Sequence, residues 1–216
     1  FTQDWATFLI PNSETDPDKR KSYLPVIDTE AVKELVAHVH STGAKAMLYN
    51  MIYAVSLEEG VPNEVKSAIV RNLQDHFNFG KKGDVTATDI QQFLDPGDPN
   101  WQKFIIEVMT KAMKEGGFDG WQGDTMGSNW VEKVSEPGKG FSLSEHYPEL
   151  ATAATEALKK EGYDFMINDI STGDADRLGK TNVSAPYAEV WGDSIAYDST
   201  YQAWNRLYPY KRNQDG

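Results

Sequence analysis

Two carboxylates stand at the ends of short apolar segments, and each has glycine and tryptophan close by. Asp124 follows the run from Gly120 to Gly123, and Glu189 lies near the end of the segment from Ala185 to Val190. In parallel α/β proteins the active site lies where the strands end, at their carboxyl-terminal edge. Two such carboxylates predict paired acid chemistry, in which one side chain attacks or takes a proton and the other donates one.

The surrounding sequence predicts the elements that would position these carboxylates. Helix, glycine and apolar strand follow one another three times, which is typical of βα units around a parallel sheet. Capping residues and glycines mark the helix ends. The predicted helices are 31–39, 98–113 and 144–161, ending at Gly43, Gly116 with Gly117, and Gly162; the strands that follow are 45–53, 118–122 and 163–169.

Less regular elements complete this prediction. A fourth strand is expected at 185–190 after a short helix at 175–178. Further helices are expected at 64–78 and 198–207, and the opening residues 1–25, rich in Asp, Pro, Ser and Lys, are expected to form a long loop.

Polar residues end each of the four predicted strands. Because parallel strands share one carboxyl-terminal edge, these side chains should converge in one cleft. Any one of them can instead cap a turn or the next helix, and Asp169 fits that alternative as well as it fits a site. The strand-end residues are Tyr49 and Asn50, Gln122 and Asp124, Asn168 and Asp169, and Glu189 and Trp191.

Other catalytic constellations lack their key residues. The four histidines all fall in predicted helices or at helix starts, and there is no cysteine. Neither a nucleophile elbow, a P-loop nor a dinucleotide-binding glycine motif is present. What remains is catalysis by a carboxylate pair, or a metal ion held by carboxylates.

Glycoside hydrolysis uses such a pair, one carboxylate as nucleophile or base and the other as the acid. Aromatic rings near the strand ends could pack on the apolar faces of sugars, while amides bond hydroxyl groups. Ordinary packing inside a barrel is the alternative role for these rings. They are Tyr49, Tyr53, Trp121, Tyr187 and Trp191.

A magnesium-dependent lyase or isomerase is the alternative enzyme class. Asp124, Asp169 and Glu189 would then be the ligands, since hard cations favour oxygen clusters. Such enzymes usually add a lysine or histidine base, and no predicted strand end carries one.

The segments 117–125 and 186–191 resemble the two catalytic motifs of the glycoside hydrolase family 66 dextranases, and 46–54 extends the likeness. The resemblance implies that Asp124 is the nucleophile and Glu189 the acid/base of a retaining endo-cleavage of α-1,6-glucan. It implies a (β/α)8 TIM barrel and no metal or organic cofactor. The resemblance and the strand-end positions together indicate six candidate residues for contact with the sugar: Asn50, Tyr53, Gln122, Asn168, Asp169 and Trp191.

Two alternatives remain within this resemblance. A sister group of the family cyclises the product by transglycosylation, and the sequence does not separate the two outcomes. The chain is also short for eight strands, since a complete barrel usually takes about 250 residues. We therefore interpret 1–216 as a single catalytic barrel domain or part of one, covering about the third to sixth strands, and a non-catalytic glucan-binding fragment is the second alternative.

Composition limits the partners. A net charge of -12 would repel phosphate backbones and anionic lipid, so neutral α-1,6-glucans (dextran and isomaltooligosaccharides) are expected rather than nucleic acid. No apolar run reaches the roughly 18 residues needed to span a bilayer, so membrane insertion is not expected. The absence of cysteine is common in secreted bacterial enzymes. Because the chain begins at Phe1, we expect a processed or excerpted extracellular protein whose export signal lies outside this sequence.

Overall fold

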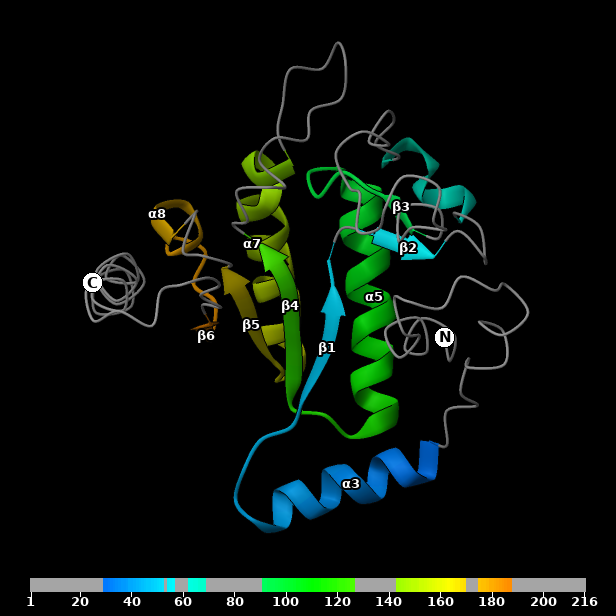
Figure 1. Ribbon diagram of the computed structural model, residues 1–216, viewed down its shortest axis with the longest axis vertical. Helices are drawn as coiled ribbons and strands as arrows, with labels where there is room; N and C mark the ends of the chain where they lie inside the picture. The colour runs from blue at the N-terminus through cyan, green and yellow to red at the C-terminus, as the bar shows by residue number, and fades with distance from the viewer. Residues whose placement is uncertain are drawn as a thin grey trace, which may run out of the picture.

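The computed structural model describes residues 29–52, 54–56, 62–68, 91–126, 143–169 and 175–187 (Figure 1). Its main elements alternate between helix and strand along the chain. The helices are α3 (Thr29–Ser41), η1 (Asn63–Ala68, a 3-10 helix), α5 (Pro99–Gly116), α7 (Leu143–Glu161) and α8 (Ala175–Leu178). The strands are β1 (Met47–Met51), β2 (Ala54–Ser56), β3 (Gln91–Phe93), β4 (Gly120–Met126), β5 (Asp164–Asp169) and β6 (Ala185–Tyr187).

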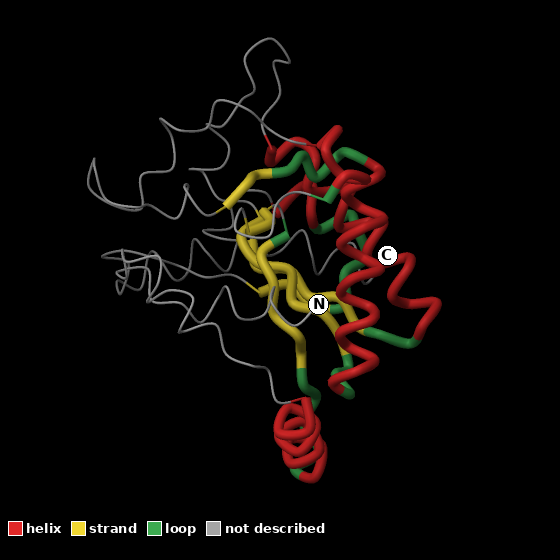
Figure 2. Tube along the Cα trace, turned by 90° about the vertical axis from the view of Figure 1, so that its right-hand side faces the viewer, coloured by secondary structure: helices red, strands yellow, loops and turns green. Residues whose placement is uncertain are grey.

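Four of the strands form one parallel sheet in the order β1-β4-β5-β6, which is also their order in the chain. Each new strand is therefore added beside the preceding one, with a helix in the connection. In Figure 2 the helices α5 and α7 cover one face of this sheet. Strands added in one direction with helices on one face form the wall of an α/β barrel, whereas a doubly wound sheet carries helices on both faces.

Left-handed glycines carry the chain from helix to strand, as the sequence predicts. Gly43, Gly117 and Gly162 have φ values of 79°, 78° and 82°. At the end of α5, the N–H groups of Gly117 and Phe118 both donate to the Met113 carbonyl, at 2.8 and 3.0 Å. A side chain at position 117 would strain this turn, so glycine fits the point where the chain reverses into β4.

The core lies between the sheet and the helices. Trp121 on β4 and Phe165 on β5 are neighbours in register, and their ring centroids are 4.9 Å apart. Both side chains are buried against apolar residues of α5 and α7. Since side chains alternate along a strand, Leu48, Gly123 and Ile167 share this helix-facing side, and the residues between them face the other side of the sheet.

The N-terminal start of α5 fixes the end of β1. Asp98 caps the helix by accepting from the N–H groups of Asn100 and Trp101, as expected for Asp before Pro99. The Trp101 ring is fully buried, and its Nε1–H donates to the Ile52 carbonyl at 2.9 Å. The chain immediately after β1 is therefore anchored to the helix layer.

Most predicted elements are confirmed, with shifted limits. β4 runs to Met126, so Asp124 lies within a strand and not on a turn. The antiparallel pair β2–β3 was not expected, and of the helix predicted at 64–78 only residues 64–68 are described, within the 3-10 helix η1. Other predictions lie outside the described residues: the loop at 1–25, the helix at 198–207 and the end of the strand predicted at 185–190.

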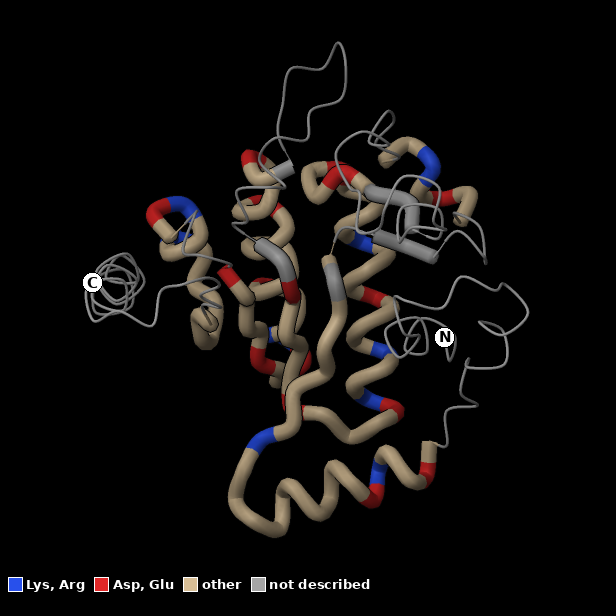
Figure 3. The backbone as a smooth tube through the Cα atoms, viewed as in Figure 1, with Lys and Arg blue, Asp and Glu red and all other residues tan. Residues whose placement is uncertain are grey.

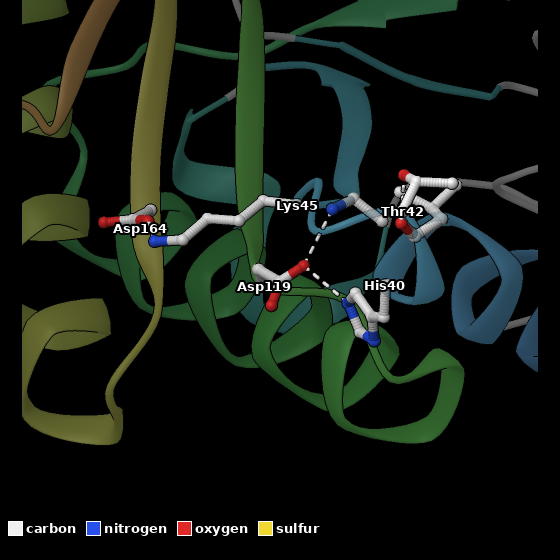
Figure 4. Close-up of polar contacts among 7 residues, drawn as sticks. His40, Thr42, Lys45, Asp119 and Asp164 are labelled. Atoms are coloured by element: carbon white, nitrogen blue, oxygen red, sulfur yellow. Dashed lines mark hydrogen bonds and ion pairs between the residues drawn. The ribbon is translucent and has the colours of Figure 1, made fainter.

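Ionic contacts join the amino ends of the strands (Figure 4). The Ala46 N–H donates to Asp119 Oδ2 at 2.7 Å, and His40 Nε2 lies 2.8 Å from the same oxygen. Lys45 Nζ donates to Asp164 Oδ2 at 2.5 Å. Charges elsewhere lie mostly on the helices and at strand ends (Figure 3). Because this edge is opposite the expected site, the contacts serve stability.

These contacts shift the pKa values of the groups involved. Burial alone would raise the pKa of Asp119, but the Ala46 N–H and His40 outweigh it, and the pKa is lowered. The hydrogen bond from Lys45 lowers the pKa of Asp164, and the same bond raises the pKa of Lys45. Both carboxylates are therefore stabilised in their charged form.

Candidate active site

Asp124 lies near the carboxyl end of β4, on the sheet face turned away from α5 and α7. Trp121 and Gly123 occupy the helix-facing positions of β4, and Gln122 and Asp124 the opposite ones. Carboxyl ends of barrel strands are where such folds place catalytic side chains. The Asp124 side chain is half-buried, so it is both supported by protein and open to a ligand.

Both oxygens of Asp124 accept hydrogen bonds from the neighbouring strands. Asn168 Nδ2 on β5 donates to Oδ1 at 2.7 Å. The Tyr49 hydroxyl on β1 donates to Oδ2. With one donor on each oxygen, the carboxylate is held in a single orientation between β1 and β5.

Strand register explains why these three side chains meet. Met51 is paired with Asp124, so Tyr49 lies two residues earlier on the same face of β1. Gln122 is paired with Met166, so Asn168 lies two residues later on the same face of β5. Asp124 itself lies where the register between β4 and β5 shifts, between Gly123 and Met126. Such irregularities commonly redirect side chains next to active sites.

The remaining predicted residues fall into three groups. Gln122 lies on the same face of β4 as Asp124, two residues earlier in the strand. Asn50 and Asp169 instead have the strand positions of Leu48 and Ile167, which face the helices, and Asp169 is fully buried. Their contact with sugar stays a prediction, but alternation along the strands does not bring them to the Asp124 face. Tyr53, Glu189 and Trp191 lie outside the described residues.

The structure divides the aromatic residues expected near the strand ends. Trp121 is fully buried and packs on Phe165, so it belongs to the core and is not a ring for sugar packing. Tyr49 and Tyr187 are each 43% exposed. Strand-end position placed Tyr49 in the same predicted cleft as Asp124, but its hydrogen bond to that carboxylate was not predicted from the sequence. The structure explains this bond by register, since residues 49 and 124 fall on one face when Met51 is paired with Asp124.

Within the described ranges, no three His, Asp or Glu side chains come together as a metal site. The metal alternative needs Asp124 and Asp169 as joint ligands. Their strand positions direct them to opposite faces of the sheet, and the third proposed ligand, Glu189, lies outside the described residues.

Comparison with known protein families shows to which family this chain belongs. The family model described as glycosyl hydrolase family 66 matches residues 8–215. The chain belongs to glycosyl hydrolase family 66. This confirms the resemblance that the motifs around Asp124 and Glu189 carry. It also shows that the likeness extends over nearly all of the sequence.

Relatives of this family 66 chain include two kinds of enzyme by name. A dextranase of Streptococcus salivarius is 40% identical over 175 residues, which are 76% of this chain and 21% of that protein. A cycloisomaltooligosaccharide glucanotransferase of Niallia circulans is 27% identical over 192 residues, 79% of this chain and 18% of that protein. The chain thus spans about a fifth of the length of the curated relatives it matches.

Solved structures confirm the fold class of this family 66 chain. A cycloisomaltooligosaccharide glucanotransferase of Paenibacillus sp., complexed with cycloisomaltoheptaose, aligns with a TM-score of 0.62 at 22% identity, covering 85% of this chain and 27% of that one. A maltogenic α-amylase of Thermotoga neapolitana aligns with a TM-score of 0.51 at 11% identity, covering 89% and 40%. The described sheet is part of an α/β barrel. None of its described helices is long and apolar enough to cross a bilayer.

Proposed function

We propose that this chain carries the catalytic centre of a retaining endo-glycoside hydrolase that cleaves α-1,6-glucosidic linkages of dextran. Asp124 is the nucleophile and Glu189 the acid/base. The observation that carries the proposal is the Asp124 carboxylate near the carboxyl end of β4, oriented by Tyr49 on one side and Asn168 on the other. Family membership and the relative named as a dextranase support the reaction and the substrate.

The reaction proceeds in two displacements at one anomeric carbon. In the first, an oxygen of Asp124 bonds to that carbon, the glycosidic bond breaks, and Glu189 gives its proton to the departing oxygen. In the second, Glu189 takes a proton from water, the water oxygen bonds to the carbon, and Asp124 is released. A retaining pair requires the two carboxyl groups to stand about 5 to 5.5 Å apart.

Cyclisation is the second candidate outcome, because two relatives and one structural neighbour are cycloisomaltooligosaccharide glucanotransferases. The first displacement would be the same. The acceptor in the second would be a sugar hydroxyl of the bound chain in place of water. The higher identity to the dextranase, 40% against 27%, favours hydrolysis. Linear isomaltooligosaccharides released from dextran indicate hydrolysis, and cyclic products indicate transfer.

A polymeric substrate also supports an extracellular location, because a glucan chain of this kind does not cross a bilayer unaided. The enzyme must therefore meet dextran outside the cell. Detection of the protein and its activity in culture medium or on the cell surface, with none in the cytoplasm, is the expected result.

Replacement of Asp124 by Asn tests the assignment. The variant keeps the size of the side chain but lacks the nucleophilic charge, so release of sugars from dextran should fall at least about a thousandfold while dextran still binds. Asp176→Asn, an exposed position on α8, is the matched control and should keep full activity. A near-normal rate in Asp124→Asn excludes the assignment. Dextran binding without sugar release by the wild-type protein would support the non-catalytic alternative.

A further inference from the structure

The two donors that hold Asp124 differ sharply in exposure. Asn168 on Oδ1 shares the sheet face of Asp124 but is only 2% exposed. Tyr49 on Oδ2 is 43% exposed and lies on the open face. One oxygen is therefore supported from inside the protein, and the other is held by a residue that a bound ligand can reach.

Tyr49 is presented by a well-anchored strand. Leu48, which precedes Tyr49, is buried in the core. Three residues after Tyr49, the Ile52 carbonyl accepts a buried hydrogen bond from Trp101 Nε1 at 2.9 Å. β1 also pairs with β4 over five consecutive positions, ending at Met51 opposite Asp124. The backbone that carries Tyr49 is thus fixed relative to the backbone that carries Asp124, although the ring itself is exposed.

We propose that Tyr49 is a positioning residue for the nucleophile, which acts through its hydroxyl on Asp124 Oδ2. The inference rests on the proposed function of Asp124. The phenol keeps its proton throughout and supplies only a hydrogen bond. In the first displacement Asp124 bonds to the anomeric carbon, the glycosidic bond breaks, and Glu189 protonates the leaving oxygen. The contribution of Tyr49 is that the carboxylate already lies in the attacking orientation when the substrate arrives.

This role differs from ring packing on a sugar. A sugar platform uses the apolar face of the ring and gains little from the hydroxyl, so it governs binding. A positioning bond uses the hydroxyl and governs the chemical step, where small displacements of a reacting group cost large factors in rate. Tyr49→Phe separates the two roles because it keeps the ring and removes the hydroxyl.

In the intact protein, Tyr49→Phe should lower kcat on dextran about 10- to 100-fold and change KM less than about threefold. Its melting temperature should remain that of the wild type, because the side chain is exposed. Tyr163→Phe, at the opposite end of the sheet just before β5, is the matched control and should change neither kinetic constant. Unchanged kcat in Tyr49→Phe, or a rise in KM alone, overturns the proposal.

A covalent trap distinguishes failure of this inference from failure of the proposed function. An activated fluoroglycoside that leaves a slowly hydrolysed glycosyl-enzyme should label the wild-type protein at Asp124, as read by mass spectrometry of the modified peptide. Tyr49→Phe should be labelled at the same residue, but about 10- to 100-fold more slowly. Labelling elsewhere or not at all overturns the role of Asp124. Labelling of Asp124 at equal rates in both proteins overturns only the role of Tyr49.

Discussion

Gly123 lies against the Ile52 side chain and leaves no room for a side chain of its own. A β-carbon at position 123 would stand 2.8 Å from Ile52 Cγ2 and 3.1 Å from the Phe165 ring. Such a distance is too short for two carbon atoms, so the glycine before Asp124 is required by the fit between β4 and the residue that follows β1. The position of the proposed nucleophile therefore depends on core packing directly behind it.

Gly123→Ala should both destabilise the protein and slow catalysis. Overpacking of this kind costs about 1 to 3 kcal/mol, and relief of the clash must shift β4 at the residue before Asp124. Chemical denaturation measures the first effect and kcat on dextran the second. Gly162→Ala is the control, since its β-carbon meets no atom within 4 Å and only its φ of +82° opposes substitution. It should lose about 1 kcal/mol with kcat unchanged. Equal kcat in wild type and Gly123→Ala would contradict the prediction.

The ion pair between Lys45 and Asp164 predicts a loss of stability in acid. The pKa of Asp164 is lowered from 3.8 by the hydrogen bond from Lys45. Its contribution is therefore fully present above pH 3.8 and disappears as the pH falls through the lower folded value. Asp164→Asn should reduce the free energy of unfolding near neutral pH and make it fall less steeply as the pH drops below 3.8.

Lys45→Met provides the matched variant for this pair. It removes the same hydrogen bond from the other side, and should also flatten the acid dependence of unfolding. The pKa of Lys45 is raised from 10.5, so its own contribution is present below pH 10.5 and is lost as the pH rises through the folded value. If the single variants keep the full acid dependence of the wild type, the ion pair does not contribute to it.

Trp101→Phe should destabilise the protein more than Trp121→Phe, although both tryptophans are fully buried. Trp101 donates to the Ile52 carbonyl, and its loss leaves a buried acceptor unpaired, which costs about 1 to 3 kcal/mol in addition to the lost volume. Trp121 Nε1 has no hydrogen-bond partner in the part of the chain that the structure describes, so Trp121→Phe loses packing alone. Urea unfolding of both variants tests the difference. Equal losses would mean that the bond to Ile52 adds nothing.

The sequence predicted the helices and their order well because their ends have local causes. Asp98 and Gly117 cap α5 through contacts within a few residues, and those contacts follow from residue type. The length of β4 has no local cause. The predicted strand ended at 122, with Asp124 taken as a carboxylate set between glycines, but pairing with β1 and β5 carries the strand to Met126.

The candidate site was also predictable only in part, because position along a strand is a local property and register between strands is not. Strand ends identified Asp124 and Asn168, which the structure joins by a hydrogen bond of 2.7 Å. Alternation between the two faces then separates Asn168 from Asp169, its neighbour in sequence, which is buried on the side of the helices. Position at a strand end says which residues are near the site. Register between strands, which depends on distant segments, decides which of them face it.

Asn168 and Tyr49 should prove strongly coupled in their effect on catalysis. Asn168→Ala removes the donor on Asp124 Oδ1 and should lower kcat about 10- to 100-fold, as Tyr49→Phe should from the other oxygen. Once either bond is gone the carboxylate can turn, so loss of the second donor has less left to disturb. The double variant should therefore be slower than the poorer single variant by less than about threefold, far less than the product of the two effects. Kinetics on dextran for all four proteins give the coupling, with thermal unfolding to confirm that each remains folded. Strictly multiplicative effects would show that the two residues act independently, and that they do not share the task of orienting Asp124.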